Sequence, residues 1–119
     1  DGEMELAIIE RFHGDKFAIY KKVDGEYREV YSYPIYMNFY HAVFSATING
    51  IPSIIGGARR GKQQLFVIQY DKANNRYKSI VLDEKVGPSN VNIINTKQGD
   101  IIMSANREIG QAAIYRISK

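Results

Sequence analysis

The sequence predicts an all-β protein built of antiparallel strands, and three observations carry this prediction. Short apolar runs separated by turn residues recur along all 119 residues. Tyrosine is unusually common, with nine residues, and β-branched side chains dominate the apolar positions. Both residue types suit the pleated, half-buried surface of a sheet. No segment places apolar residues at helical spacing between capping residues, so helices are not expected.

Ten of these apolar runs are expected to be strands. They cover residues 4–11, 17–23, 27–33, 41–48, 52–59, 64–70, 77–83, 91–95, 100–106 and 111–117. The Asp24-Gly25 and Asn49-Gly50 turns tolerate the positive φ angles that two-residue hairpins require. Strands joined by such turns lie side by side and antiparallel, so the ten strands are expected to form a meander.

The predicted meander repeats along the chain. Leu6, Ile54 and Ile101 fall in register at nearly equal spacing, and the same spacing separates His41 from Ser89, each near the opening of a strand. The interval is roughly 50 residues, and four strands in a repeat of that length is the period of a β-propeller blade. The sequence therefore predicts an all-β fold of four-stranded propeller blades.

These repeats form one propeller segment over residues 1–119. It contains a partial blade at 3–33, a full blade at 40–83 and a second partial blade at 89–117. Propellers have four to eight blades, so this segment is expected to be an incomplete ring or a fragment of a larger propeller. The missing blades would come from the rest of a longer chain or from further copies of this one.

The repeats resemble the FG-GAP/VCBS family of propeller blades. Residues 40–50, 54–61, 65–71, 99–104 and 113–115 carry the resemblance. Blades of this family often hold calcium in an Asp-x-Asp-x-Asp-Gly loop, but the corresponding turn here is Thr47-Ile48-Asn49-Gly50. Calcium requires several converging oxygen ligands, and this turn offers no carboxylate. No metal or cofactor is therefore expected.

Composition argues against several classes of partner. The net charge of +3 comes from basic residues spread along the chain, whereas nucleic-acid binding requires basic clusters. No apolar run approaches the roughly 18 residues of a membrane span. There is no cysteine for a disulfide or thiolate metal site. Neither nucleic acid nor membrane is expected as a partner, and both a cytoplasmic and a secreted location remain open.

His41 and several arginines are candidate binding residues. His41 opens an innermost strand, where it could bind a ligand, act as a base, or simply hydrogen-bond a neighbouring blade. Arg59, Arg60 and Arg107, with Arg11, end the second strand of each repeat. Equivalent positions lie on one face of a propeller, so these guanidinium groups could form an arc for a carboxylate, phosphate or acidic sugar. The alternative is that each arginine pairs with an acidic group on an adjacent blade.

Aromatic and amide side chains in the connections between repeats are further candidates. Tyr33, Tyr36, Phe39 and Tyr40 lie in the long connection before the second repeat, where they could stack on a ligand or plug the space between blades. Asn90 and Asn92 follow the equivalent connection and could hydrogen-bond a ligand.

The sequence contains no constellation that would make the chain an enzyme by itself. It has neither a Gly-x-Ser-x-Gly elbow nor a phosphate-binding glycine loop. The expected function is a non-catalytic scaffold that binds a protein or carbohydrate through loops on one face. The expected ligand-binding residues are His41, Arg59, Arg60, Arg107, Tyr36, Tyr40, Asn90 and Asn92.

Two alternatives remain open. The chain also resembles part of a propeller lyase acting on sugar derivatives, which would make His41 a ligand or base and Arg59 or Arg60 the substrate anchor. It could equally be a purely structural repeat within a larger protein.

Overall fold

The computed structural model describes residues 4–10 and 14–118, which consist almost entirely of β-strands. The strands are β1 (Glu5–Glu10), β2 (Lys16–Val23), β3 (Glu26–Ser32), β4 (Tyr40–Ile48), β5 (Ile51–Ala58), β6 (Leu65–Asp71), β7 (Arg76–Asp83), β8 (Pro88–Thr96), β9 (Gly99–Asn106) and β10 (Gln111–Ser118). A short 3₁₀ helix, η1 (Arg107–Ile109), precedes β10. All ten predicted strands are present, with ends that differ by a few residues. The described part of the chain holds no helix of the length and apolarity that crossing a membrane requires.

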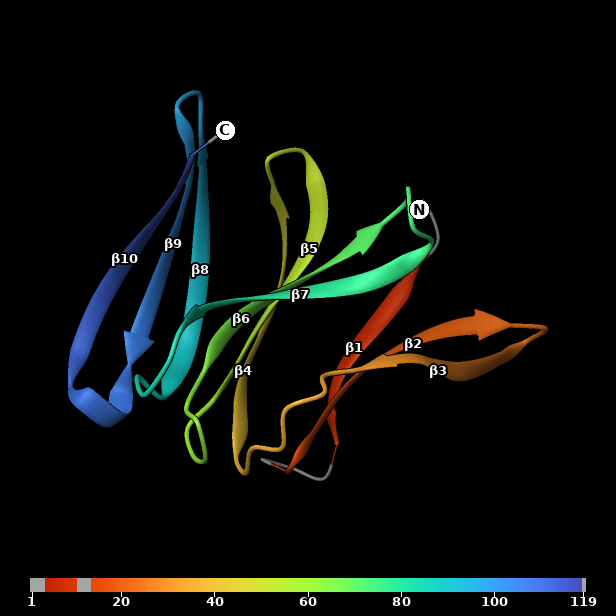
Figure 1. The fold of residues 1–119 in the computed structure, drawn as a ribbon, viewed down its shortest axis with the longest axis horizontal. Coiled ribbons are helices and arrows are strands. Elements are labelled where there is room, and N and C mark those ends of the chain that lie inside the picture. Colours follow the sequence, from red (N-terminus) through yellow and green to blue (C-terminus); the bar gives the residue numbers. More distant parts are fainter. Residues whose placement is uncertain (1–3, 11–13, 119) are drawn as a thin grey trace.

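The strands form three antiparallel sheets, each made of strands consecutive in sequence. The first sheet is β1-β2-β3, the second is β4-β5-β6-β7 and the third is β8-β9-β10. The sheets lie next to one another in chain order, with the second between the other two (Figure 1). The prediction of an all-β fold of antiparallel meanders is confirmed. The described residues form no closed ring.

The two predicted hairpins adopt the expected geometry. Asp24 and Gly25 have φ angles of 52° and 84°, and Asn49 and Gly50 have 49° and 77°. Positive φ at both central residues matches the right-handed twist of the flanking strands. The β2–β3 and β4–β5 pairings therefore continue up to these turns.

Strand pairing in the second sheet repeats in the third at a constant offset along the chain. The pair Val43–Gly56 recurs as Val91–Ser104. The irregularity between Tyr40 and Ala42 recurs between Pro88 and Asn90. This register places Ile54 in correspondence with Ile102, the residue after the Ile101 expected from the sequence.

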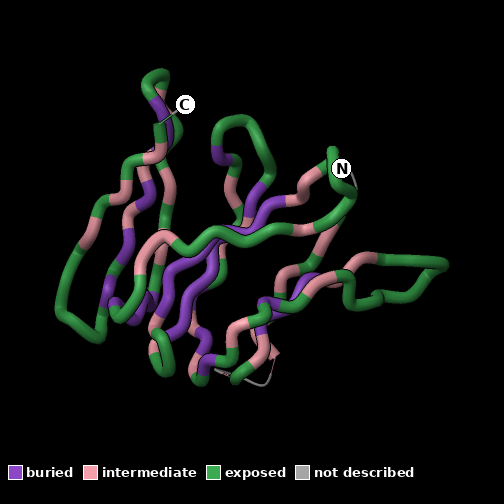
Figure 2. Tube along the Cα trace, viewed as in Figure 1, coloured by how far each residue is buried: buried purple, intermediate pink, exposed green. Residues whose placement is uncertain are grey.

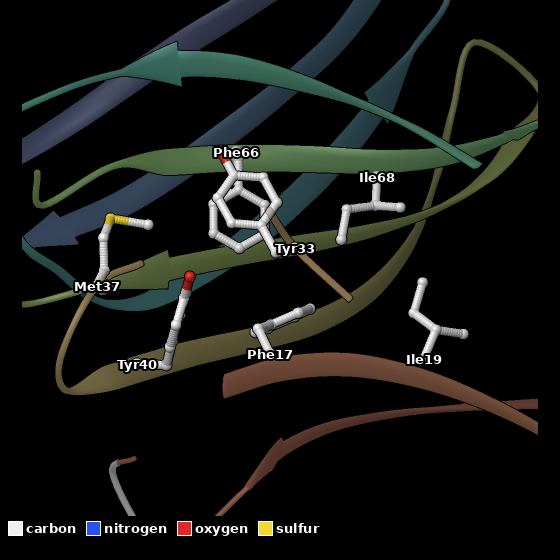
Figure 3. Packing of buried hydrophobic residues seen from close by; sticks show 8 residues of the cluster. Phe17, Ile19, Tyr33, Met37, Tyr40, Phe66 and Ile68 are labelled. Atoms are coloured by element: carbon white, nitrogen blue, oxygen red, sulfur yellow. The ribbon is translucent and has the colours of Figure 1, made fainter. Parts of the chain in front are cut away.

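An aromatic cluster joins the first sheet to the second. The Phe66 ring lies parallel to the Tyr33 ring at a centroid distance of 3.7 Å and edge-on to Phe17 at 5.2 Å (Figure 3). Aromatic contacts of this kind add to the hydrophobic gain from burying the rings. The buried members are Phe17, Ile19, Tyr33, Met37, Tyr40, Ala58, Phe66 and Ile68.

An aliphatic cluster joins the second sheet to the third. Its buried members are Ile48, Ile55, Leu65, Val67, Val86 and Ile102. The second sheet is thus covered on both faces, and β5 and β6 are its most buried strands (Figure 2). The continuous apolar run of β6 follows from this position, because a strand covered on both faces needs no polar alternation.

Gly56 and Gly57 allow these sheets to approach closely. A Cβ atom on Gly56 would lie 2.9 Å from the Phe17 Cε2 of the first sheet, and one on Gly57 would lie 2.2 Å from the Pro88 Cγ of the third. The pairing of β5 with β6 is regular at these two glycines. The extra residue of the irregular pairing is instead His41 on β4, opposite Gly57 and Ala58.

Candidate ligand-binding site

The connections between strands gather at one end of the sheets, opposite the Asn49-Gly50 turn (Figure 1). We call this the loop end. It comprises residues 33–39, 59–64, 84–87 and 107–110. Backbone hydrogen bonds tie these connections together, including Lys85 N to Lys62 O at 3.0 Å and Gly87 N to Gln63 O at 3.2 Å. The loop end therefore presents an ordered backbone surface.

One backbone arrangement occurs twice at the loop end, at the offset of the repeat. The Arg59 N–H donates to the Phe39 carbonyl at 2.9 Å, and the Arg107 N–H donates to the Gly87 carbonyl at 3.1 Å. Phe39 and Gly87 share a left-handed conformation, with φ of 61° and 60°. Corresponding residues of successive units thus occupy corresponding places in the structure. Arg11, the third position of the predicted arc, lies outside the described residues.

Phe39 has a left-handed backbone conformation, and the residue at the same position of the next repeat, Gly87, is a glycine. For a residue with a Cβ, the left-handed region costs roughly 1–2 kcal/mol. The Phe39 ring lies nearly parallel to the His41 ring, with centroids 5.9 Å apart and an interplanar angle of 4°. Backbone strain such as that at Phe39 often accompanies a functional surface.

Two guanidinium groups lie over the Phe39 ring. The Arg59 Cζ is 4.8 Å and the Arg60 Cζ 6.0 Å from its centroid, distances at which a cation is attracted by the ring quadrupole. The Phe39 ring therefore supports both arginines. Phe39, His41, Arg59 and Arg60 together are called the loop-end cluster below.

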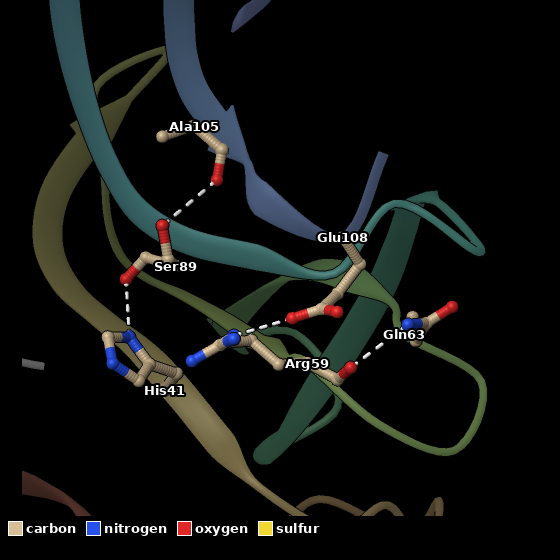
Figure 4. Close-up of polar contacts among 6 residues, drawn as sticks. All are labelled: His41, Arg59, Gln63, Ser89, Ala105 and Glu108. Atoms are coloured by element: carbon tan, nitrogen blue, oxygen red, sulfur yellow. Dashed lines mark hydrogen bonds and ion pairs between the residues drawn. The ribbon is translucent and has the colours of Figure 1, made fainter. Parts of the chain in front are cut away.

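His41 also connects two sheets. Its Nδ1 lies 2.7 Å from the Ser89 carbonyl oxygen, which accepts the hydrogen bond (Figure 4). Ser89 is the third-sheet counterpart of His41, since both occupy the irregular position of their strands. The structural role that the sequence allowed for His41 is present. In the neutral ring, donation from Nδ1 leaves the lone pair on Nε2.

The arginines differ in their partners. The Arg59 Nε donates to the Glu108 Oε1 at 2.7 Å, which links the second sheet to η1 (Figure 4). This contact matches the alternative in which an arginine pairs with an acidic group of the next unit. Arg60 and Arg107 are exposed, and no ion pair to a described residue is found for either. These two guanidinium groups, unlike that of Arg59, remain available to a ligand.

The aromatic connection divides into buried and exposed members. Tyr40 is a core residue whose hydroxyl donates to the Ile35 carbonyl at 2.7 Å, and burial raises the pKa of its phenol above the usual range. The Tyr33 hydroxyl donates to the Gln64 Oε1 at 2.7 Å, and burial raises the pKa of Tyr33 to about 12. Tyr36, by contrast, is 70% exposed. The aromatic connection therefore fills the space between sheets through Tyr33 and Tyr40, whereas stacking of Tyr36 on a ligand stays a prediction.

Asn90 and Asn92 lie away from the loop-end cluster. Both are exposed in β8, whereas the intervening Val91 packs toward the second sheet. Alternation along a strand therefore directs the two amides to the outer face of the third sheet. The Asn92 Oδ1 accepts a hydrogen bond from the Ile93 N–H at 2.8 Å.

Two residues of this region lie outside the set of binding residues expected from the sequence. Phe39 belongs to the aromatic connection but not to that set, and Glu108 is absent from it. The sequence does contain a signal for Phe39. It occupies the repeat position of Gly87, and a bulky residue in place of a glycine at such a position indicates backbone strain. The pairing of Arg59 with Glu108 crosses two sheets, and no local pattern reveals it.

A recess of about 600 Å³ opens at the other end of the molecule, between the first and second sheets. Ala7, Ile19, Ile54 and Ile68 form its apolar lining. Tyr70 and Tyr77 pack edge-on at 5.1 Å along its side. Because the lining comes from two sheets, sequence spacing alone did not reveal this recess.

The described residues contain no group of three or more His, Asp or Glu side chains arranged to hold a metal ion. Comparison of the chain with protein-family models, with curated proteins and with solved structures found no match.

Proposed function

We propose that this chain is part of a propeller-type repeat scaffold that binds a protein or carbohydrate ligand through its loop end, without catalysing a reaction. The ligand would present anionic groups, such as the carboxylates of an acidic sugar or an acidic protein segment. The observation that carries this proposal is the loop-end cluster, in which a strained Phe39 supports the guanidinium groups of Arg59 and Arg60.

The chemistry of the cluster favours an anion. A guanidinium group is always charged and presents a planar fork of donors that matches a carboxylate or phosphate. Glu108 already occupies Arg59, so Arg60 and Arg107 would make the direct contacts. The exposed Tyr36 of the same end could provide a flat surface for a sugar ring.

The repeat geometry supports the propeller interpretation. Successive sheets pack face to face, and the backbone contacts of Arg59 at the loop end recur at Arg107 in the next unit. In such an arrangement, loops of successive units line one surface, so a ligand can contact several units at once.

Binding to polygalacturonate, a polysaccharide of acidic sugars, and to a poly-glutamate peptide tests the proposal. Arg60→Gln and Arg107→Gln are each expected to weaken binding to one of these probes about tenfold, because each removes a charge-assisted hydrogen bond. Calorimetric titration of the full chain measures the affinity.

Arg76→Gln is the matched control, because Arg76 is exposed at the start of β7, at the opposite end of the second sheet. Equal weakening by all three substitutions would show that binding depends only on the net charge of the chain. Failure of both anionic probes to bind, or equal binding to a neutral galactan, would contradict the proposal.

The lyase alternative stays a prediction with a test of its own. The His41 contact with Ser89 directs Nδ1 inward and leaves Nε2 as the basic nitrogen of the neutral ring. A lyase would release unsaturated sugars from polygalacturonate, and His41→Ala would abolish that release. Binding without any release would favour the scaffold.

A further inference from the structure

An acidic residue follows β9 at the position where the preceding repeat carries an arginine. At the constant offset of the strand pairing, Glu108 corresponds to Arg60. Arg60 is exposed beside the Phe39 ring, whereas the Glu108 carboxylate accepts a hydrogen bond from the Arg59 guanidinium group. One repeat therefore presents two adjacent cations at the loop end, and the next repeat supplies a carboxylate that neutralises one of them.

The contact between Glu108 and Arg59 depends on the glycine at position 87. A Cβ atom on Gly87 would lie 2.1 Å from the Glu108 Cγ, so the Glu108 side chain lies directly against the Gly87 backbone. From there its Oε1 reaches the Arg59 Nε at 2.7 Å (Figure 4). The preceding repeat has Phe39 at this position, where a side chain fills the space. The missing side chain of Gly87 therefore makes room for the acid.

Of the two partners in this ion pair, Glu108 is held by the weaker part of the fold. It belongs to η1, a single turn of three residues, none of which is buried. Arg59 directly follows β5, and its side chain is only 17% exposed and lies over the Phe39 ring. Segments with few buried contacts open at low free energy. The acid is therefore the partner that can leave, while the arginine stays in place.

We propose that Glu108 is an internal competitor for Arg59 and thereby sets the affinity of the loop end for its anionic ligand. In the free protein the Glu108 carboxylate occupies the Arg59 guanidinium group. On binding, an anionic group of the ligand takes its place and η1 moves aside. This inference rests on the proposed function, because it describes the regulation of the same site.

The number of contacts decides when the ligand wins this competition. At Arg59 alone, the ligand exchanges one carboxylate for another and gains little, since a partly exposed ion pair is weak. A ligand held at the same time by Arg60 and Arg107 presents its next anionic group to Arg59 at a high effective concentration. The exchange therefore becomes favourable for a ligand that contacts successive repeats.

Glu108→Gln tests the inference, with Glu84→Gln as the matched control. Both substitutions remove one negative charge from an exposed residue of the loop end, but the Glu84 Oε1 accepts from the Gln64 side chain at 3.2 Å and pairs with no described cation. Glu108→Gln should raise the affinity for polygalacturonate about tenfold, because it makes Arg59 available for a charge-assisted hydrogen bond. Glu84→Gln should raise it by no more than about threefold, because salt screens charges that are not in contact.

Arg59→Gln, measured in both backgrounds, identifies the source of the gain. In the otherwise unchanged chain it should lower the affinity by less than about threefold, because Glu108 already occupies Arg59. Combined with Glu108→Gln, it should remove the whole gain, because the gain comes from Arg59. Calorimetric titration measures the affinities, and circular dichroism verifies that each variant retains the strand content of the parent chain.

Three results would overturn the inference. A loss of affinity in Glu108→Gln would mean that the acid holds Arg59 in place for the ligand. A gain no larger than that of Glu84→Gln would reduce its effect to charge alone. The third is an equal effect of Arg59→Gln in both backgrounds.

Each of these results leaves the loop-end proposal intact, because binding that depends on Arg60 and Arg107 would persist in the parent chain. An absence of binding to polygalacturonate and to poly-glutamate in every variant would instead contradict the proposed function, and this inference with it.

Discussion

Gly57 and Ala105 are counterparts in the repeat, yet they meet different surroundings. A Cβ atom on Gly57 would lie 2.2 Å from the Pro88 Cγ, within the joint between the second and third sheets. Ala105 is exposed on the outer face of the third sheet. The same position of the repeat is therefore restricted to glycine only where a neighbouring sheet covers it.

This difference predicts opposite outcomes for one substitution at the two positions. Gly57→Val should lower the free energy of unfolding by about 1–3 kcal/mol, because the added methyl groups force the β5 and β8 backbones apart. Ala105→Val should change it by less than about 0.5 kcal/mol, as is usual at exposed positions. Urea denaturation followed by circular dichroism measures both, and an equal cost at the two positions would contradict the packing argument.

At the scale of elements, the joint between β4 and β8 is pinned near both strand ends. His41 and Ser89 meet at the loop end. At the other end, the Asp100 Oδ2 accepts from the Asn49 N–H at 2.7 Å, and the Asn95 side chain donates to the Thr47 carbonyl at 2.8 Å. Hydrogen bonds at both ends fix the register of one sheet against the next, which apolar packing alone leaves free to slide.

Asp100 is the residue of this joint whose loss should be most costly. Asp100→Ala would remove the acceptor of the partly buried Asn49 N–H and of the Asn95 amide, so the free energy of unfolding should fall by about 1–3 kcal/mol. Glu26→Ala, at an exposed position in β3, is the control and should have little effect. Chemical denaturation measures the difference. A loss equal to that of the control would show that the joint does not depend on this carboxylate.

At the scale of the whole molecule, two sheet interfaces of different chemistry hold the fold together. The interface of the first and second sheets contains Tyr33 and Tyr40, whereas the buried residues of the other cluster are aliphatic. A buried tyrosine can ionise only at a cost, because the phenolate loses its hydration. Ionisation of these two buried tyrosines therefore makes the first interface sensitive to alkaline pH.

The sign of this effect follows from the raised pKa values of both tyrosines. In the unfolded chain a tyrosine ionises near pH 10, so the stabilisation is complete below about pH 10. It is lost as the pH rises from there through the folded-state pKa, which for Tyr33 is about 12.

The melting temperature should accordingly fall steeply above about pH 10. Tyr33→Phe should reduce the slope of this fall, because a phenylalanine cannot ionise. Tyr27→Phe, which changes an exposed tyrosine, should not alter it. Melting curves recorded by circular dichroism across this pH range test the prediction, and an unchanged slope in Tyr33→Phe would contradict it.

Much of the strand architecture could be predicted because its causes are local. The hairpin at Asn49-Gly50 follows from the backbone freedom of those two residues, and the alternation of exposed and half-buried residues in β10 follows from its pleat.

The candidate site was less predictable. His41, Arg59 and Arg60 do meet at the loop end, but Asn90 and Asn92 do not join them. An offset of a single position along a strand reverses the face on which a side chain lies.

By itself, the sequence determined the number of strands, their order, their antiparallel pairing and the repeat that relates Leu6 to Ile54. Those features depend on turn residues and on apolar alternation among neighbours in the chain. Only the tertiary structure decided that Tyr40 is buried while Tyr36 is exposed, that Arg59 pairs with Glu108, and that the edge of β1 borders a recess. These outcomes depend on how one sheet packs on the next, and that packing joins residues far apart in the chain whose proximity no local pattern encodes.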